Sequence, residues 1–481
     1  MTPDEVSAPS RVDPFVRDAS TVVGGPVGKH TRFGAAHFWS PLRILVVLGM
    51  LTFTAGFFAK MPCAGHAWAN HYQYTRLCYS DVYALYFAEG LDDDKVPYVD
   101  HPVEYPVVIG GAMLAASKVG DDGRDFFLVT SALLLACAVG TVILTGRLAG
   151  RRRPWDAALV ALAPGLLLHG TTNWDLISAF LLALAMWAWA RRQPGVAGLW
   201  LGLGIATKLY PGMLLVALFF LCWRAKRMRE WAIASAVSIA TAALVYAPVI
   251  AASKSFAYTD CETNQRVMQK AWLRFFALNR CRPADWDSFA FIWQRWRGEF
   301  LDHTTLNRIT AVLVIAVVAA VGIVTLTAPR RPRVAQVMFL LLAGFLLVNK
   351  VNSPQYTIWL IPLAALARPR WGAFLSWQAA EILVMFTRFY FFVHEGTNGA
   401  DGIPDRWFIG AVLLRNGLLM LVMALVVREI YRPYHDAVRR DGEDDPAGGV
   451  LDGALDRDEV VVGGYDQWVP PRDPLGAPGP A

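Results

Sequence analysis

The chain has 481 residues, of which 55% are hydrophobic and only 17% are charged. A soluble protein of this length needs more charge to cover its surface, so the composition excludes a soluble enzyme and indicates a protein that crosses a membrane several times. The formal net charge of +6 is distributed in short basic clusters between apolar stretches, which is typical of oriented membrane spans and not of a nucleic-acid-binding surface.

Residues 1–41 are polar and basic and lack the pattern of a cleavable signal peptide, so Leu42–Phe58 is expected to be a retained first span. If all the basic clusters face the cytoplasm, the apolar stretches cross in pairs and give about twelve spans with both termini cytoplasmic. The expected fold class is therefore an all-α integral membrane protein with a transmembrane domain over residues 42–432. The further spans expected are Phe126–Thr145, Ala157–Leu168, Leu176–Ala190, Val196–Ala206, Leu209–Cys222, Trp231–Ala251, Ile309–Leu326, Val334–Val348, Tyr356–Ala367, Ala373–Phe391 and Phe408–Val427.

The stretch Val103–Ala116 does not fit this pairing. It is short, and it opens with the sequence Glu-Tyr-Pro. A full crossing would place the basic cluster Arg147–Arg153 outside, against the positive-inside rule. We therefore expect a juxtamembrane or re-entrant helix on the outer side. The alternative is a thirteenth span with one inverted basic loop.

The six cysteines test this path. Cys137 and Cys222 fall within expected spans, where they serve as small apolar residues. The other four fall in the two large loops assigned to the outside, where disulfides Cys63–Cys78 and Cys261–Cys281 would suit an oxidising compartment. The alternative is four unpaired thiols.

The last part of the chain differs in composition from the rest. Residues 433–481 are rich in Asp, Gly and Pro and show no apolar periodicity. This composition predicts a disordered cytoplasmic tail.

Four polar and aromatic segments resemble signatures of glycosyltransferase family 87, a family of membrane glycosyltransferases of the C-type (GT-C) superfamily with many actinobacterial members. They are "SDVYALYFAEGL", "VPYVDHPVEYPV", "GLGIATKLYPGMLL" and "NSPQYTIWLIPL", and the resemblance covers about residues 42–432. It implies a GT-C-like helical bundle that transfers a sugar from a polyprenyl-phosphate donor, such as polyprenyl-phosphate mannose or arabinose. It also implies a catalytic acid in the first extracytoplasmic loop, and Asp81 matches that position.

Inverting sugar transfer needs a base that takes the proton of the attacking hydroxyl, and Asp81 is the candidate for this role. The ring of Tyr83, on the same expected helix, is a candidate to stack on a sugar face. The alternative interpretation makes Ser80 or Asp81 a helix N-cap.

The leaving polyprenyl phosphate needs a cation nearby. Lys208, between two short spans, is the first candidate, and Arg388 is the second. The alternatives are that Lys208 extends to the membrane interface and that Arg388 is an anchor beside an aromatic belt.

Other polar and aromatic residues at the outer ends of spans are expected to contact the donor or acceptor. The remaining candidate substrate-binding residues are Glu104, Tyr105, His169, Asp175, Tyr210, Gln355 and Tyr356. Glu104 can equally be a surface acid at a helix start, and Asp175 can equally cap the returning span.

Two further groups of charges have structural interpretations. The acids Asp92–Asp94 and Asp100 are suited to a divalent cation but also to a solvated loop, so no cofactor or required metal is expected. Glu381 and Arg415 lie deeper, within neighbouring spans, and are predicted to form an ion pair.

The function expected is transfer of a hexose or pentose from the lipid donor to a glycan or glycolipid acceptor of the cell envelope. The active site would face outward from the plasma membrane, and the partners would be lipids and glycans, with no nucleic acid. Two alternatives remain at this stage, a lipid or solute transporter and a non-catalytic scaffold.

Overall fold

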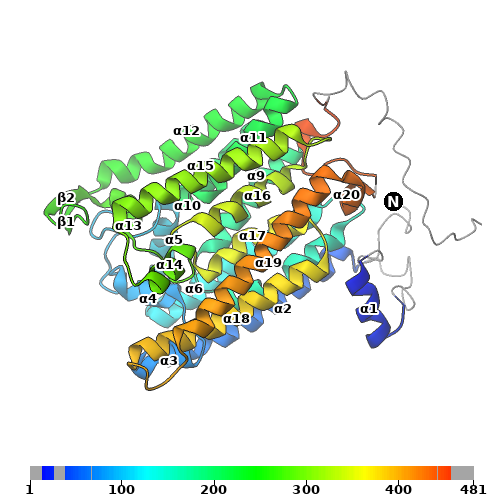
Figure 1. Cartoon of the computed structure of the whole chain (residues 1–481). Helices are drawn as coiled ribbons and strands as arrows, with labels where there is room; N and C mark the ends of the chain where they lie inside the picture. The colour runs from blue at the N-terminus through cyan, green and yellow to red at the C-terminus, as the bar shows by residue number, and fades with distance from the viewer. Residues whose placement is uncertain (1–12, 27–37, 67, 441, 455, 457–481) are drawn as a thin grey trace, which may run out of the picture.

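The computed structural model describes residues 13–26, 38–66, 68–440, 442–454 and 456, and this part of the chain forms a bundle of helices (Figure 1). The helices of the first half are α1 (Pro14–Val23), α2 (Pro41–Lys60), α3 (Tyr72–Thr75), α4 (Asp81–Ala88), α5 (Val107–Ser117), α6 (Gly123–Leu148), α7 (Ala158–Ala161), α8 (Pro164–His169), α9 (Asp175–Ala190), α10 (Pro194–Thr207), α11 (Met213–Arg224) and α12 (Met228–Ala252). Those of the second half are α13 (Arg274–Cys281), α14 (Phe289–Arg297), α15 (His303–Thr327), α16 (Val334–Val348), α17 (Thr357–Ala367), α18 (Trp371–Gly396), α19 (Asp405–Tyr431) and α20 (Ala437–Arg440).

The strands β1 (Ser255–Thr259) and β2 (Arg266–Lys270) form one antiparallel hairpin, in which Ser255 pairs with Lys270. The hairpin lies at the same end of the bundle as α3, α4, α13 and α14, whereas α1 and α20 lie at the opposite end (Figure 1). The segments expected outside and those expected in the cytoplasm therefore gather at opposite ends of the molecule.

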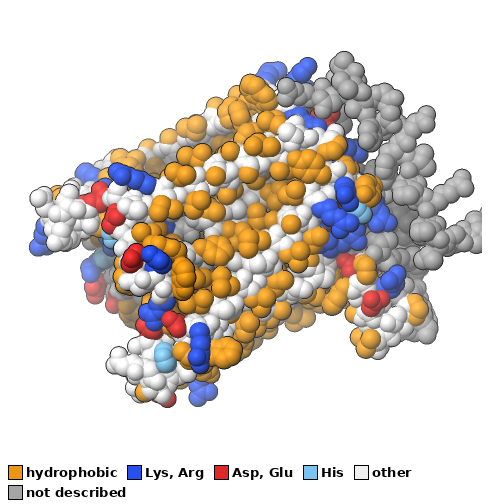
Figure 2. Space-filling model, in the orientation of Figure 1, with side chains coloured by type: hydrophobic (Ala, Val, Ile, Leu, Met, Phe, Trp, Pro, Cys, Tyr) orange, Lys and Arg blue, Asp and Glu red, His pale blue; other side chains and the backbone are white. Residues whose placement is uncertain are grey.

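Five of the described helices are long and apolar enough to cross a membrane. They are Pro41–Cys63, Gly123–Leu148, Met228–Ala252, His303–Thr327 and Asp405–Tyr431. Hydrophobic side chains cover the middle of the bundle, and Lys, Arg, Asp and Glu gather towards its two ends (Figure 2). This distribution is that of an all-α membrane protein, because a bilayer excludes charge from the apolar middle of a spanning bundle.

The other expected spans are shorter helices. The stretch Ala157–Leu168 is divided between α7 and α8, because Pro164 has no N–H to continue the helix from α7. Val334–Val348 is α16 with the predicted bounds, but it has only 15 residues. The count of about twelve spans therefore stays a prediction. The short segment expected to be re-entrant is α5, an 11-residue helix that begins directly after Pro106.

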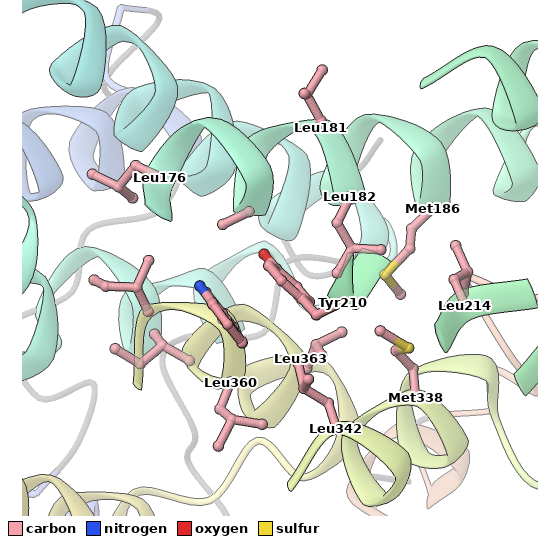
Figure 3. Packing of buried hydrophobic residues seen from close by; sticks show 14 of the residues in the cluster. Leu176, Leu181, Leu182, Met186, Tyr210, Leu214, Met338, Leu342, Leu360 and Leu363 are labelled. Carbon is pink, nitrogen blue, oxygen red and sulfur yellow. The ribbon is translucent and has the colours of Figure 1, made fainter. Parts of the chain in front are cut away.

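The interior of the bundle is built around α17, all of whose residues are buried. A helix that is apolar on every side is stable only when other helices surround it. Figure 3 shows Leu363 of α17 beside Leu342 of α16, with Leu182 of α9 and Tyr210 in the same buried core. This rigid centre supports the loops that form the site.

The start of the 433–481 tail includes described residues that contact the bundle, while the disorder expected for the tail as a whole stays a prediction. Asp436 forms an ion pair with the buried Arg333 at 2.8 Å, and Asp456 pairs with the buried Arg224 at 2.6 Å. The acids that suggested a solvated tail instead neutralise arginines at helix ends, which sequence periodicity does not reveal. The residues after Asp456 lie outside the described part of the chain.

Candidate active site

Asp81 is placed by backbone contacts between two loops. Ser80 is extended and does not cap α4 through its side chain; its hydroxyl donates instead to the carbonyl of Thr171 at 2.7 Å. The N–H of Asp81 donates to the carbonyl of Thr172 at 2.8 Å. The first residue of α4 is therefore fixed against the loop that follows α8, and its side chain is free for other contacts.

The Asp81 carboxylate accepts a hydrogen bond on each oxygen. The Tyr79 hydroxyl donates to Oδ1 at 2.6 Å, and Asn173 Nδ2 donates to Oδ2 at 2.8 Å. The charge on Asp81, together with burial, raises the pKa of Tyr79 above its ordinary value, so Tyr79 remains a donor. Asn173 Nδ2 also donates to the Tyr105 hydroxyl at 2.7 Å. These contacts orient one carboxylate without neutralising it.

The first disulfide holds the segment that leads to Asp81. Cys63, just after α2, is bonded to Cys78, so the chain before α4 is tied to the end of a candidate span. The buried Lys60 adds a second link, because its Nζ donates to the Tyr79 carbonyl at 2.8 Å.

Asp81 lies on the wall of a cavity of about 260 Å³. The cavity is lined by Lys60, Tyr74, Tyr79, Asp81, His169, Thr172, Arg282, Asp285, Trp286, Ser353, Pro354, Gln355, Met385, Arg388, Phe389 and Phe392. Four residues selected from the sequence are among them: Asp81, His169, Gln355 and Arg388. The walls combine two acids, several cations and aromatic rings, a mixture of polar and aromatic groups that is typical of a small-molecule site.

The buried side chain of His169 has a ring nitrogen without a hydrogen-bond partner among the described residues. Its side chain is buried, with only 5% of its surface exposed, and Nε2 has no hydrogen-bond partner within the described residues. A buried polar atom without a partner costs free energy unless a ligand or water satisfies it. His169 is thus suited to contact a bound molecule in the cavity.

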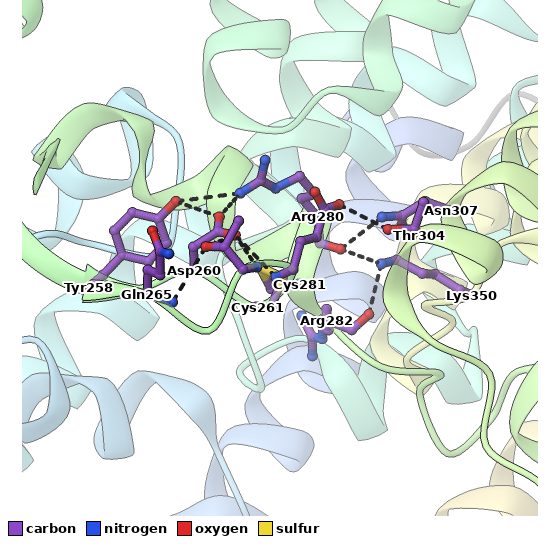
Figure 4. The surroundings of a disulfide bond; sticks show 12 residues. Tyr258, Asp260, Cys261, Gln265, Arg280, Cys281, Arg282, Thr304, Asn307 and Lys350 are labelled. Carbon is purple, nitrogen blue, oxygen red and sulfur yellow. Dashed lines mark hydrogen bonds and ion pairs between the residues drawn. A yellow bond between two sulfur atoms is a disulfide. The ribbon is translucent and has the colours of Figure 1, made fainter. Parts of the chain in front are cut away.

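Arg282 reaches the cavity from the second large loop, beside the disulfide Cys261–Cys281 (Figure 4). Lys350 Nζ donates to the backbone carbonyl of Arg282 at 2.7 Å and so holds the backbone at this point. Within the described chain, the Arg282 guanidinium forms no hydrogen bond or ion pair, although the residue is largely enclosed. Burial, and secondarily the charge on Arg282, lower the pKa of Lys350 to about 8. The cavity therefore contains a guanidinium that is available to an anion.

A second cation, Arg388, is already partly neutralised. It contacts Asp287, a fully buried acid that also accepts from Arg415 Nη1 at 3.0 Å. The predicted Glu381–Arg415 ion pair is confirmed at 3.8 Å, but Asp287 is the closer partner of Arg415. Sequence reasoning missed Asp287 because it lies in a loop far along the chain from both spans.

Lys208 lies outside the cavity lining. Its Nζ contacts Asp175 Oδ1 at 2.5 Å and lies about 5.5 Å from the ring centres of Tyr105, Tyr356 and Trp359. The same carboxylate oxygen accepts from the Trp359 indole at 2.8 Å. Asp175 and Lys208 thus neutralise each other inside an aromatic enclosure next to the site.

All four selected tyrosines lie outside the cavity lining, and three of them besides Tyr105 pack on other rings. Tyr210 stacks on Trp359 with ring centres 4.1 Å apart, and Figure 3 shows it among leucines and methionines of the core. Tyr356 stacks on the same ring at 4.0 Å. Tyr83 packs edge-on against Phe87. Their rings serve packing in this arrangement, because each is held by another aromatic side chain.

Glu104 is half-buried beside the site, although it does not line the cavity. Its backbone N–H donates to Glu89 Oε1 at 3.2 Å. Burial, and then the charge on Asp81, raise the pKa of Glu104.

Three of the four acids considered for a divalent cation are paired with lysines. Asp93 contacts Lys95, Asp94 contacts Lys118 and Asp100 contacts Lys254, at 2.9, 2.7 and 2.8 Å. In the part of the chain that the structure describes, no three acids, histidines or cysteines are grouped as metal ligands would be.

The residues that sequence reasoning missed come from positions without a motif. Tyr79, Asn173 and Arg282 adjoin recognised residues: Tyr79 and Arg282 follow cysteines that form the disulfides, and Asn173 lies inside the segment around His169. Their position next to disulfide cysteines in the two large loops was the signal that could have identified Tyr79 and Arg282.

Comparison with known protein families gives a match over the middle of the chain. The model of glycosyltransferase family 87 matches residues 112–349, from α5 to the end of α16, and a search of curated proteins gave no match. The matched region contains His169, Asn173 and Arg282, whereas Asp81 and Arg388 lie outside it. This match, on a helical membrane bundle with an acid and cations around one cavity, identifies the chain as a member of glycosyltransferase family 87.

Proposed function

We propose that this glycosyltransferase moves a hexose or pentose, with mannose and arabinose the leading sugars, from a polyprenyl-phosphate donor to a glycan or glycolipid acceptor of the cell envelope. The observation that carries the proposal is the arrangement in one cavity of the doubly hydrogen-bonded Asp81 carboxylate with the free Arg282 guanidinium. A carboxylate can accept a proton, and a guanidinium can stabilise a departing phosphate.

In this mechanism the acceptor hydroxyl attacks the anomeric carbon from the side opposite the phosphate. Asp81 takes the hydroxyl proton while the bond between the anomeric carbon and the phosphate oxygen breaks. The phosphate leaves with the electron pair, so the sugar is inverted and the lipid product carries the additional negative charge. Aromatic residues on the wall, such as Trp286 and Phe389, would cover the apolar faces of the sugar.

For the phosphate we propose Arg282 as the principal cation, with Arg388 beside it. Asp175 already neutralises Lys208, and Asp287 shares the charge of Arg388, whereas Arg282 has no acid contact within the described chain. Guanidinium groups bind phosphate oxygens in a bidentate manner, so Arg282→Lys should retain only part of the function.

The cavity volume limits what it holds at one time. At about 260 Å³ it is slightly smaller than ligand pockets of about 300–1,000 Å³. This suits one sugar with its phosphate and not a whole glycan. The polyprenyl tail would stay in the bilayer, so no soluble nucleotide sugar is needed.

We further propose that the cavity faces the extracytoplasmic side of the plasma membrane and that both termini are cytoplasmic. Both disulfides lie at the end of the bundle that carries the cavity, and disulfides persist in oxidising compartments. The opposite end carries basic residues such as Arg224 and Arg333, in accord with the positive-inside rule.

The test uses purified protein in liposomes with radiolabelled polyprenyl-phosphate mannose or arabinose and envelope glycolipid acceptors. Removal of a general base lowers rates by about 10²- to 10⁴-fold, so Asp81→Asn should lose transfer by that factor while remaining folded. Full transfer by a folded Asp81→Asn protein would exclude Asp81 as the base. Absence of transfer by the wild-type protein with both donors would instead favour the transporter.

A further inference from the structure

Helix α14, in the second large loop, exposes a row of aromatic side chains. Trp296 is 79% exposed and Trp293 is 38% exposed, while Phe300, just beyond the helix, is 83% exposed. Trp293 and Trp296 are three residues apart and so share one side of the helix, and the opposite side of α14 is buried through Phe291 and Gln294. One side of the helix is thus packed on the protein, whereas Trp296 and the nearby Phe300 are left largely exposed within the described chain.

Ion pairs to the ends of two long helices fix the position of α14 along the axis of the bundle. Arg295 contacts Asp405 at 2.8 Å and Glu395 at 3.0 Å. Asp405 is the first residue of α19, a candidate span, and Glu395 lies at the end of α18. The helix is therefore held where the apolar part of the bundle ends, as Figures 1 and 2 show.

The ends of the neighbouring helices α15 and α19 also place α14 near the boundary of the apolar region. The candidate span α15 begins at His303, shortly after Phe300, and Trp407 in the first turn of α19 is 61% exposed. Tryptophan is enriched at membrane interfaces because its ring is apolar and its N–H is polar. In water, these exposed rings would form an unfavourable apolar patch.

We propose that α14 lies in the lipid headgroup region of the leaflet at the cavity end, with Trp293, Trp296 and Phe300 in contact with lipid. The partner is a lipid surface, and the charged Arg297 next to these rings suits the phosphate groups of lipids. This inference does not depend on sugar transfer.

The position of α14 also bears on the cavity. The segment directly before it contains Asp285 and Trp286, which line the cavity, and Asp285 accepts from the Ser353 hydroxyl at 2.8 Å. A helix seated in the lipid surface would thus support one wall of the cavity.

The test measures the depth of single labels on the full-length protein in liposomes. Four described cysteines are paired and the other two are buried, so a fluorescent bimane should react only with an introduced cysteine. Trp296→Cys and Phe300→Cys provide two independent probes of α14. Gln265→Cys, at the exposed hairpin turn, is the control for water, and Leu421→Cys, near the middle of α19, is the control for the apolar interior.

We expect lipids with a nitroxide near the headgroup to quench most of the fluorescence at positions 296 and 300, whereas aqueous iodide quenches little. The label at position 265 should show the reverse, and the label at 421 should respond to nitroxides deep in the acyl chain. If the labels at 296 and 300 behave like the label at 265, the proposal is wrong. It is equally wrong if they crosslink to a second copy of the chain and show no lipid quenching.

Discussion

The two hydrogen bonds to Asp81 predict a specific effect of replacing Asn173. Asn173→Ala removes the 2.8 Å bond to Asp81 Oδ2 and the 2.7 Å bond to the Tyr105 hydroxyl. A hydrogen bond to a charged group contributes about 1.5–3 kcal/mol. If this free energy orients the base in the transition state, it corresponds to a loss of about 10- to 150-fold in rate, at about 1.4 kcal/mol for each factor of ten.

The effect should fall on kcat more than on KM, because Asn173 does not line the cavity. Asn173→Asp is a sharper variant of the same size: it places a second carboxylate where the donor stood, so we expect at least the loss seen with Ala. The assay is transfer from the radiolabelled lipid donor, with thermal unfolding measured on each variant.

Asn307→Ala is the matched control. Asn307 donates to the Arg280 carbonyl at 2.9 Å at the same end of the molecule, and it makes no contact with the cavity (Figure 4). This variant loses a neutral hydrogen bond, and its transfer rate should stay within about threefold of wild type. If Asn173→Ala also keeps its rate within threefold, orientation of Asp81 by Asn173 is not part of the mechanism.

Three further predictions follow from charges and bonds near the site. Burial raises the pKa of Glu89 to about 7, so the folded protein holds a proton that the unfolded chain has lost, and the free energy of unfolding falls as the pH rises from about 4.5 to 7. Glu89→Gln should flatten this dependence and stabilise the protein at pH 8 by up to about 3 kcal/mol. Unfolding at several pH values measures the effect, and an unchanged pH slope would contradict the raised pKa. Asp287→Ala leaves the buried charge of Arg415 without this acid and should lower the free energy of unfolding by about 3–5 kcal/mol. The double variant with Arg415→Ala should lose less stability than the sum of the two single variants. Additive losses would count against an Asp287–Arg415 ion pair. Replacing Cys63 and Cys78 together by Ser should lower the free energy of unfolding by about 3 kcal/mol and should also lower the rate of sugar transfer. An unaffected transfer rate would show that this disulfide does not position Asp81.

Much of the helical organisation could be predicted because it follows from the length of the apolar stretches and the position of the basic clusters in the sequence. Val334–Val348 was expected with the bounds that α16 has, and the two disulfides join the pairs expected from the loop assignment. Local sequence decides these features, since a span needs a continuous apolar run and a disulfide needs two cysteines in one compartment.

The arrangement of charges in space was harder to predict. Lys208 has the residue type that a phosphate site requires, but Asp175 comes close enough to neutralise it only after α9 and α10 pack together. Arg282 carries no motif and becomes prominent only because no acid contacts it within the described chain. Which charges cancel one another depends on tertiary contacts, which a single sequence does not specify.

The acids near the end of the described chain bear on how the protein can be produced. A shortened form ending at residue 432, where the apolar spans end, would remove Asp436 and Asp456 and leave Arg333 and Arg224 enclosed without counter-charges. Such a truncation would cost stability although it deletes no helix of the bundle core. Purification tags and fusion partners therefore belong beyond residue 456.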